Sequence, residues 1–156
     1  MKILILTVSD RGYGGEYEDR SGPEIERLLK AKYPGTEVHR ETVPDETTAI
    51  THAFSRYTDA DYIFTTGGTG ISPRDVTPEA TAAYVQRQLP GVAEMLRMRS
   101  LEQTPFAALS RGIAGTKGRT ILVNFPGSVK GAAFCTTLML PLLEHGVSMI
   151  RGGSHE

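Results

Sequence analysis

The fold of this sequence is decided by the segment Thr65-Thr66-Gly67-Gly68-Thr69-Gly70-Ile71-Ser72-Pro73-Arg74-Asp75. Residues 61–66, where the segment begins, form an apolar run with the length of a buried strand. Thr77-Pro78-Glu79 predicts a helix start, because Thr caps well, Pro is tolerated at the first helical position and Glu suits the positive helix end. The segment is therefore a glycine-rich connection between a strand and a helix. In α/β sheets such connections lie outside the carboxyl ends of strands, where ligands bind.

Strands and helices alternate on both sides of this segment. Further strands are predicted at residues 2–8, 37–43 and 119–125. Helices are predicted from Pro23 to Tyr33, after Asp45, from Thr77, over 92–101 and over 129–149 with a break or kink at Pro141. This order predicts one α/β domain over residues 1–150, with a mostly parallel sheet covered on both faces, and a flexible tail at 151–156.

Composition narrows the function classes. The 156 residues suffice for one domain with a core. Lys and Arg total 17 against 18 Asp and Glu, so the basic excess usual in nucleic-acid binders is missing. The single cysteine, Cys135, cannot form an internal disulfide, which indicates a reducing cytoplasm. The apolar start is too short for a signal peptide, and no apolar run approaches the ~20 residues of a membrane span. We therefore expect a cytoplasmic protein that binds neither nucleic acid nor membrane.

The glycine-rich segment has two interpretations. Its glycines allow a charged ligand to approach backbone N–H groups, while its hydroxyls and Arg74 supply donors and a cation for phosphate. Alternatively, a tight strand-to-helix crossover needs glycine for its turns. The segment lacks the Gly-Lys-Ser/Thr ending of a Walker A motif, and Pro73 stands where a Rossmann motif needs its third glycine. Both interpretations remain open on the residues alone.

Three aspartates lie at the ends of predicted strands. Asp75 could anchor Mg²⁺, which prefers oxygen ligands, or could hydrogen-bond its own backbone in a turn. Asp45 follows Pro44 and precedes a helix, so an N-cap role explains it fully. Asp10 and Ser9 are explained as turn residues. Carboxylates at these positions therefore allow, but do not demand, a metal site.

Other residue types exclude some chemistry. The histidines, at positions 39, 52, 145 and 155, lack the spacing of zinc ligands. No serine lies in the Gly-x-Ser-x-Gly motif of a serine hydrolase. Cys135 falls at helical spacing among apolar residues, which predicts a buried core thiol rather than a nucleophile.

Residues 65–81 resemble the signature of the molybdenum cofactor biosynthesis family, which comprises MogA-type molybdopterin adenylyltransferases, MoaB proteins and the G domains of plant and animal fusion proteins. Four further stretches resemble the family's other loops: Val8-Ser9-Asp10-Arg11, Val43-Pro44-Asp45-Glu46, Ala108-Leu109-Ser110-Arg111 and Asn124-Phe125-Pro126-Gly127-Ser128. The resemblance covers nearly the whole chain. It departs at Val129, where many family members carry proline.

The resemblance implies a three-layer α/β/α domain, a homotrimer, ATP and molybdopterin as substrates, Mg²⁺ as cofactor and a downstream molybdenum-insertion protein as partner. It implies catalytic and metal-binding roles for Asp45 and Asp75. The substrate contacts it implies are Ser9, Asp10, Thr66, Gly67, Gly68, Thr69, Gly70, Ser72, Arg74, Ser110, Arg111, Pro126, Gly127 and Ser128. Two alternatives remain: a MoaB-type binding or scaffold protein without turnover, and a nucleotide-binding α/β domain of unrelated function.

Overall fold

The computed structural model describes residues 1–153, and within them a mixed sheet of six strands in the order β2-β1-β3-β6-β5-β4. Four neighbouring strands are parallel: β2 (Glu37–Val43), β1 (Lys2–Val8), β3 (Tyr62–Thr66) and β6 (Thr120–Phe125). The short strands β5 (Ala114–Lys117) and β4 (Arg87–Gln88) are antiparallel. The mostly parallel sheet is confirmed. The two short strands were not predicted, because Ala-Gly-Thr-Lys and Arg-Gln carry no apolar run.

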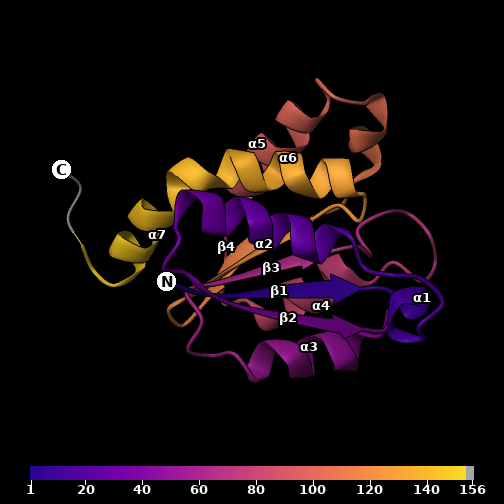
Figure 1. The fold of residues 1–156 in the computed structure, drawn as a ribbon, viewed down its shortest axis with the longest axis horizontal. Coiled ribbons are helices and arrows are strands. Elements are labelled where there is room, and N and C mark those ends of the chain that lie inside the picture. The colour runs from indigo at the N-terminus through magenta and orange to yellow at the C-terminus, as the bar shows by residue number, and fades with distance from the viewer. Residues whose placement is uncertain (154–156) are drawn as a thin grey trace.

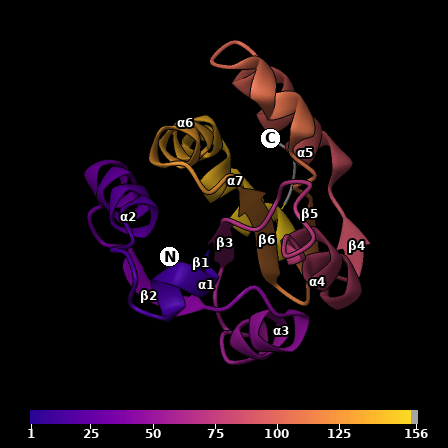
Figure 2. The ribbon, with the colours of Figure 1, turned by 90° about the vertical axis from the view of Figure 1, so that its right-hand side faces the viewer.

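Helices cover both faces of the sheet, as Figures 1 and 2 show. One face carries α2 (Ser21–Lys32), α5 (Pro90–Ser100), α6 (Val129–Met139) and α7 (Leu143–Ile150). The other carries α3 (Thr47–Ser55) and α4 (Thr77–Tyr84). The predicted three-layer architecture is therefore confirmed.

Side chains of β1 alternate between the two layers of core. Ile3 and Ile5 pack with α2, α6 and α7, whereas Leu4 and Leu6 pack with α3 and α4. All four are fully buried. Because both faces of a central parallel strand are covered, the strand is apolar along its length, and this explains the continuous run at residues 2–8.

Short elements account for most departures from prediction. A helix that was not predicted, α1 (Asp10–Tyr13), follows β1, and α2 begins at Ser21 rather than at the predicted Pro23. The 3₁₀ helix η1 (Pro105–Leu109) follows α5, and η2 (Leu140–Leu142) separates α6 from α7. Pro141 lies in η2, so the predicted break is confirmed.

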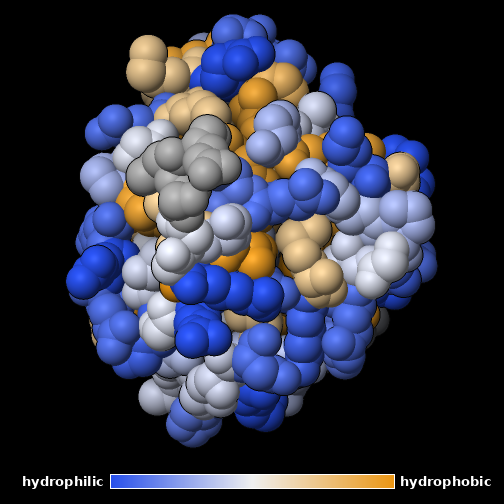
Figure 3. Space-filling view, turned by 90° about the vertical axis from the view of Figure 1, so that its left-hand side faces the viewer, coloured by the Kyte–Doolittle hydropathy of each residue, from blue (hydrophilic) through white to orange (hydrophobic). Residues whose placement is uncertain are grey.

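The helical stretch 129–150 has, by length and mean hydropathy of 1.3, what a membrane-crossing helix needs. A core helix of a globular domain passes the same test, and the buried side of α6 belongs to the core between β6 and α2. The end of the molecule near α7 shows hydrophobic residues interspersed among hydrophilic ones (Figure 3). Of the tail predicted to be flexible, Arg151 pairs with Asp61 (Nη2 to Oδ1, 2.6 Å), and residues 154–156 lie outside the described part of the chain.

Candidate functional site

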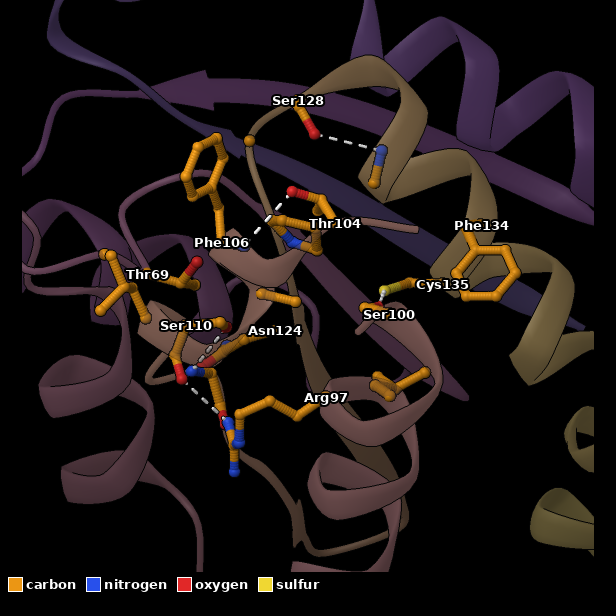
Figure 4. A pocket seen from close by; sticks show the side chains of 18 of the residues that line it. Thr69, Arg97, Ser100, Thr104, Phe106, Ser110, Asn124, Ser128, Phe134 and Cys135 are labelled. Atoms are coloured by element: carbon orange, nitrogen blue, oxygen red, sulfur yellow. Dashed lines mark hydrogen bonds between the residues drawn. The ribbon is translucent and has the colours of Figure 1, made fainter. Parts of the chain in front are cut away.

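A cavity of about 570 Å³ lies at the carboxyl ends of β3 and β6. One wall consists of the glycine loop and the connections around residues 110–112 and 126–128. The other consists of α5, η1 and α6, and Figure 4 shows side chains from both walls facing the same space. Eight of the predicted site residues line it: Gly68, Thr69, Gly70, Asp75, Ser110, Pro126, Gly127 and Ser128. The other predicted residues lie outside this lining, and several of them hold the loops that form it.

Two glycines of the loop have backbone angles that only glycine adopts easily: φ is 101° at Gly67 and 70° at Gly68. A Cβ on Gly67 would overlap the carbonyl oxygen of Val8. A Cβ on Gly68 would overlap the Thr77 hydroxyl and lie 3.1 Å from Asp45 Oδ1. The loops pack backbone against backbone here, so the structural interpretation of these glycines is correct. The same packing places Asp45 directly beside the loop.

Thr77 and Thr66 secure the glycine loop with their hydroxyl groups. Thr77 Oγ1 donates to the carbonyl of Gly67 at 2.9 Å, and Thr66 Oγ1 donates to the carbonyl of Pro126 at 2.7 Å. The predicted N-cap role of Thr77 is wrong, because Thr77 is already inside α4 and Val76 occupies the cap position. Its hydroxyl bonds the preceding loop instead, which joins the helix to the glycine segment.

Asp45 and Asp10 bind each other's backbone. The amide of Asp10 donates to Asp45 Oδ2 at 2.9 Å, and the amide of Asp45 donates to Asp10 Oδ1 at 2.9 Å. The predicted N-cap role of Asp45 is wrong, because Glu46 precedes α3 and no side chain caps that helix. Ser9 has the predicted turn role, since its Oγ accepts from the amide of Gly12 at 3.0 Å.

Arg74 pairs with Asp10 through two hydrogen bonds of 3.0 Å, from Nε to Oδ2 and from Nη2 to Oδ1. The guanidinium group of Arg74 holds the pKa of the Asp10 carboxyl below its usual value. Burial raises the pKa of Asp45, and the negative charges of Asp10 and Asp75 raise it further. Three carboxylates and one arginine thus form one electrostatic group beside the cavity.

Asp75 forms the local turn that its sequence position predicted. The amide of Ser72 donates to Asp75 Oδ2 at 3.0 Å, and the amide of Asp75 donates to the carbonyl of Ser72 at 2.9 Å. A Cβ on Gly70 would lie 2.9 Å from Asp75 Oδ2, so the carboxylate packs against the bare backbone of the loop. Asp75 lines the cavity and Asp45 does not, but both carboxylates pack against the glycine loop.

Arg111 fixes the glycine loop from the opposite side. Its Nε donates to the carbonyl of Gly70 at 2.7 Å, and its Nη2 donates to the carbonyl of Asp75 at 2.8 Å. It also pairs with Glu79, whose pKa this contact lowers. The backbone amide of Arg111 donates to the carbonyl of Thr69 at 2.8 Å. Both the side chain and the backbone of Arg111 therefore hold the loop.

Asn124 is a site residue that sequence reasoning missed. Its Nδ2 donates to the hydroxyls of Thr65 at 2.9 Å and Thr81 at 3.0 Å, and its Oδ1 accepts from the amide of Ile113 at 3.1 Å. It lines the cavity and is only 5% exposed. The sequence signal for Asn124 is its amide side chain inside the otherwise apolar strand β6. A buried side-chain amide needs hydrogen-bond partners.

The second wall of the cavity was also not predicted from the sequence. Its apolar members come from α5, η1 and α6: Ala93, Leu96, Phe106, Ala107, Leu109, Phe134 and Cys135. Cys135 is 2% exposed, which confirms the predicted buried thiol, and burial raises its pKa to about 11. Arg97 ties this wall to the first, since its Nη1 donates to the carbonyls of Ser110 at 3.2 Å and Gly112 at 2.8 Å.

Residues 1–153 contain no group of three or more His, Cys, Asp or Glu that could hold a metal ion by themselves. Asp45 and Asp75 both pack against the glycine loop, and each has one oxygen bonded to a backbone amide. Mg²⁺ typically takes one or two protein carboxylates and completes its shell with water and substrate phosphates. The pair therefore fits Mg²⁺ carried with a nucleotide better than a metal held by protein alone.

Comparisons with known proteins identify the family of this chain. A family model described as a probable molybdopterin binding domain matches residues 4–145. The molybdopterin adenylyltransferase of Helicobacter pylori strain J99 is 39% identical over 154 residues, which cover 96% of this chain and 88% of that protein. The molybdenum cofactor synthesis protein cinnamon of Drosophila melanogaster is 38% identical over 94% of this chain, but the chain spans only 25% of its length.

A solved structure extends the likeness to the whole fold. The molybdopterin biosynthesis enzyme MoaB of Thermus thermophilus has a TM-score of 0.87 and 43% sequence identity, with 99% of each chain covered. The family match includes β3 and β6, whose following connections contribute to the loop wall of the cavity. The chain therefore belongs to the molybdenum cofactor biosynthesis family of molybdopterin-binding domains, as residues 65–81 predicted.

Proposed function

We propose that this chain transfers AMP from ATP to the terminal phosphate of molybdopterin in a Mg²⁺-dependent reaction, giving adenylyl-molybdopterin and pyrophosphate. The observation that carries the proposal is that two carboxylates pack against the glycine loop, Asp45 at Gly68 and Asp75 at Gly70. Two carboxylates repel an anionic ligand, so a protein that only bound a phosphorylated pterin would be better without them. They become useful when a divalent cation accompanies a nucleotide.

Both carboxylates suit a metal bound through one oxygen each. Asp45 Oδ2 accepts from the Asp10 amide and Asp75 Oδ2 accepts from the Ser72 amide, which leaves the second oxygen of each available. When bound, Mg²⁺ supplies positive charge that stabilises phosphate oxygens during the transfer. The backbone amides that hold the other oxygens orient the two carboxylates before substrate arrives.

The reaction depends on positioning the two phosphate groups more than on proton transfer. The terminal phosphate of molybdopterin is ionised near neutral pH, so no strong base is required. One of its oxygens forms a bond to the α-phosphorus of ATP, and the bond from that phosphorus to the bridging oxygen breaks to release pyrophosphate. The amides of Gly68, Thr69 and Gly70 and the hydroxyls of Ser110 and Ser128 surround the cavity and are suited to hold the phosphates.

We also propose the domain organisation, compartment, oligomeric state and partner that accompany this activity. Residues 1–150 act as one domain, and the protein works in the cytoplasm as a homotrimer that passes its product to a molybdenum-insertion protein. The family membership supports these assignments.

One assay tests the proposed function directly. Purified protein with ATP, Mg²⁺ and molybdopterin should release pyrophosphate, and Asp75→Asn should abolish release while molybdopterin binding persists. Asp59→Asn is the matched control, because Asp59 is 67% exposed and pairs with Lys2 at the other end of β1. Tight binding of molybdopterin without product would favour the binding or scaffold alternative. Failure to bind molybdopterin at all would favour an unrelated nucleotide-binding function.

A further inference from the structure

We infer that Asp10 and Arg74 act as a pair that positions the Asp45 carboxylate, and that Arg74 is not a ligand for substrate phosphate. This inference rests on the proposed function for its kinetic consequences, but the positioning itself concerns contacts within the chain. It departs from the family-based expectation that both residues contact substrate.

The pair joins three loops that are distant in sequence. Asp10 follows β1, Asp45 follows β2 and Arg74 belongs to the glycine loop after β3. Asp10 lies 35 positions from Asp45 and 64 from Arg74. Asp10 bonds both partners at 2.9 to 3.0 Å. A side chain that links three active-site loops fixes their relative positions.

Both carboxylate oxygens of Asp10 and two of the three guanidinium nitrogens of Arg74 are already in hydrogen bonds. Both carboxylate oxygens of Asp10 accept from Arg74, and Oδ1 also accepts from the Asp45 amide. Arg74 commits Nε and Nη2 to this contact, the two nitrogens with which a guanidinium group grips a phosphate or carboxylate side-on. A phosphate bound side-on by Arg74 would have to break the ion pair between Arg74 and Asp10. The negative charges of Asp10, Asp45 and Asp75 would then lose this compensating cation.

Stability does not explain the pair. Arg74 and Asp10 side chains are 60% and 40% exposed, and ion pairs this exposed contribute little to folding. Position does explain it, because Asp45 is anchored on one side by the Asp10 amide and faces Gly68 on the other. Without Arg74, the Asp10 carboxylate loses the cation that holds it. The negative charge of Asp10 near Asp45 is then no longer compensated.

A double-mutant cycle tests the inference. We expect Asp10→Ala and Arg74→Ala each to lower kcat by roughly 30-fold, since displacements near 1 Å cost up to ~100-fold. KM for ATP and for molybdopterin should stay within about twofold. The double variant should be no worse than either single variant, because both remove the same coupling. Asp10→Asn and Arg74→Lys repeat the test with smaller changes, should either alanine variant fail to fold.

Two measurements read the positioning without turnover. Mn²⁺ titration in the presence of α,β-methylene-ATP should show metal binding weakened roughly tenfold in each variant. Hydrogen exchange of the Asp10 and Asp45 amides should accelerate in both Arg74 variants. Arg27→Ala is the matched control, since Arg27 forms a similar two-bonded pair with Glu24 on α2, at 2.9 and 2.6 Å. It should change none of these quantities.

The inference is overturned if Arg74→Ala raises KM for ATP or molybdopterin tenfold or more while kcat is unchanged. That result would make Arg74 a phosphate ligand. Multiplicative effects in the double variant, or unchanged amide exchange, would also overturn it. Absence of pyrophosphate release by the unaltered protein would instead refute the proposed function, and the Mn²⁺ and exchange measurements would still decide the role of the pair.

Discussion

The two walls of the cavity are built by different physical means. The loop wall is fixed by hydrogen bonds between distant segments, such as those of Asn124, Arg111 and the Asp10–Asp45 pair. The helical wall is held by apolar packing beneath, and two of its rim residues are open to solvent, Phe106 at 76% and Leu109 at 53% exposure. Under the proposed function, the contrast indicates that the transfer reaction depends on the loop wall, whose segments are hydrogen-bonded to one another. Ligand selection can rest on the helical rim, where side chains can change without unfolding the domain.

The largest effect is expected at Gly68, in the loop wall. Gly68→Ala places a methyl group against the Thr77 hydroxyl and close to Asp45 Oδ1, at a φ of 70°. Activity should fall by more than ~100-fold, because the loop and the carboxylate must both shift. Pyrophosphate release measures this effect.

Gly118→Ala is the matched control for Gly68. Gly118 also has positive φ, 58°, but a Cβ there meets nothing within 4 Å. It should cost only the backbone strain, about 1 kcal/mol of unfolding free energy, and leave activity intact. Equal losses of activity in both variants would show that strain, rather than crowding of the site, is the cause.

Asn124→Ala should cause the largest loss of stability. It leaves the hydroxyls of Thr65 and Thr81 and the amide of Ile113 without their partner in a buried place. The free energy of unfolding should fall by about 2 to 4 kcal/mol, as measured by denaturant titration. Gln103→Ala removes an exposed amide from the same cavity and should change stability by less than ~0.5 kcal/mol. A similar small change at Asn124 would mean that the loop wall is not held by these bonds.

Phe106→Ala tests the helical rim. Because the ring is largely exposed, stability should change by less than about 0.5 kcal/mol. KM for molybdopterin should rise roughly fivefold, as expected when a ligand loses part of an apolar contact worth about 1 kcal/mol. Met98→Ala is the control, since Met98 is 70% exposed on α5 but does not line the cavity. Unchanged KM in both variants would remove the rim from ligand selection.

The last prediction concerns Cys135, which needs no substitution. Burial raises the pKa of its thiol to about 11, so the neutral form is favoured in the folded protein. The corresponding stability is present below the thiol pKa of the unfolded chain and is lost as pH rises toward 11. Iodoacetamide should label the native protein at pH 8 roughly 100-fold more slowly than the denatured protein, with the rate rising up to pH 11. Equal rates at pH 8 would show that the helical wall opens readily.

Much of the fold could be predicted because β1, β3 and β6 are buried on both faces and are therefore visibly apolar. The antiparallel edge could not, since β4 and β5 owe their pairing to neighbours rather than to their own composition. Thr77 and Asp45 show a second limit. Both have the residue type and position of a helix cap, yet stronger partners in space, the Gly67 carbonyl and the Asp10 amide, take their side chains.

The residues of the site also divide into those that could be predicted from the sequence and those that could not. The glycine loop and the connection at 126–128 could be predicted, because parallel strands bring their carboxyl ends together. Ser110 and Arg111 were predicted only from the family resemblance, since they precede an antiparallel strand. The rim residues Phe106 and Phe134 could not, since an aromatic residue in a helix indicates core or surface equally well. Arg74 and Arg111 show that sequence can indicate a cation near a site without indicating which atoms it serves.

The late position of β6 in the chain has a consequence for biosynthesis. β6 inserts beside β3, and Asn124 bonds Thr65 across a separation of 59 residues. Asp45 and Asp75 therefore leave the ribosome well before β6, whose Asn124 lines the cavity. Until β6 and the turn into α6 have emerged, the nascent chain has the reactive groups but no cavity to hold a ligand. Ligand binding in this cavity thus requires that synthesis of the chain has passed β6.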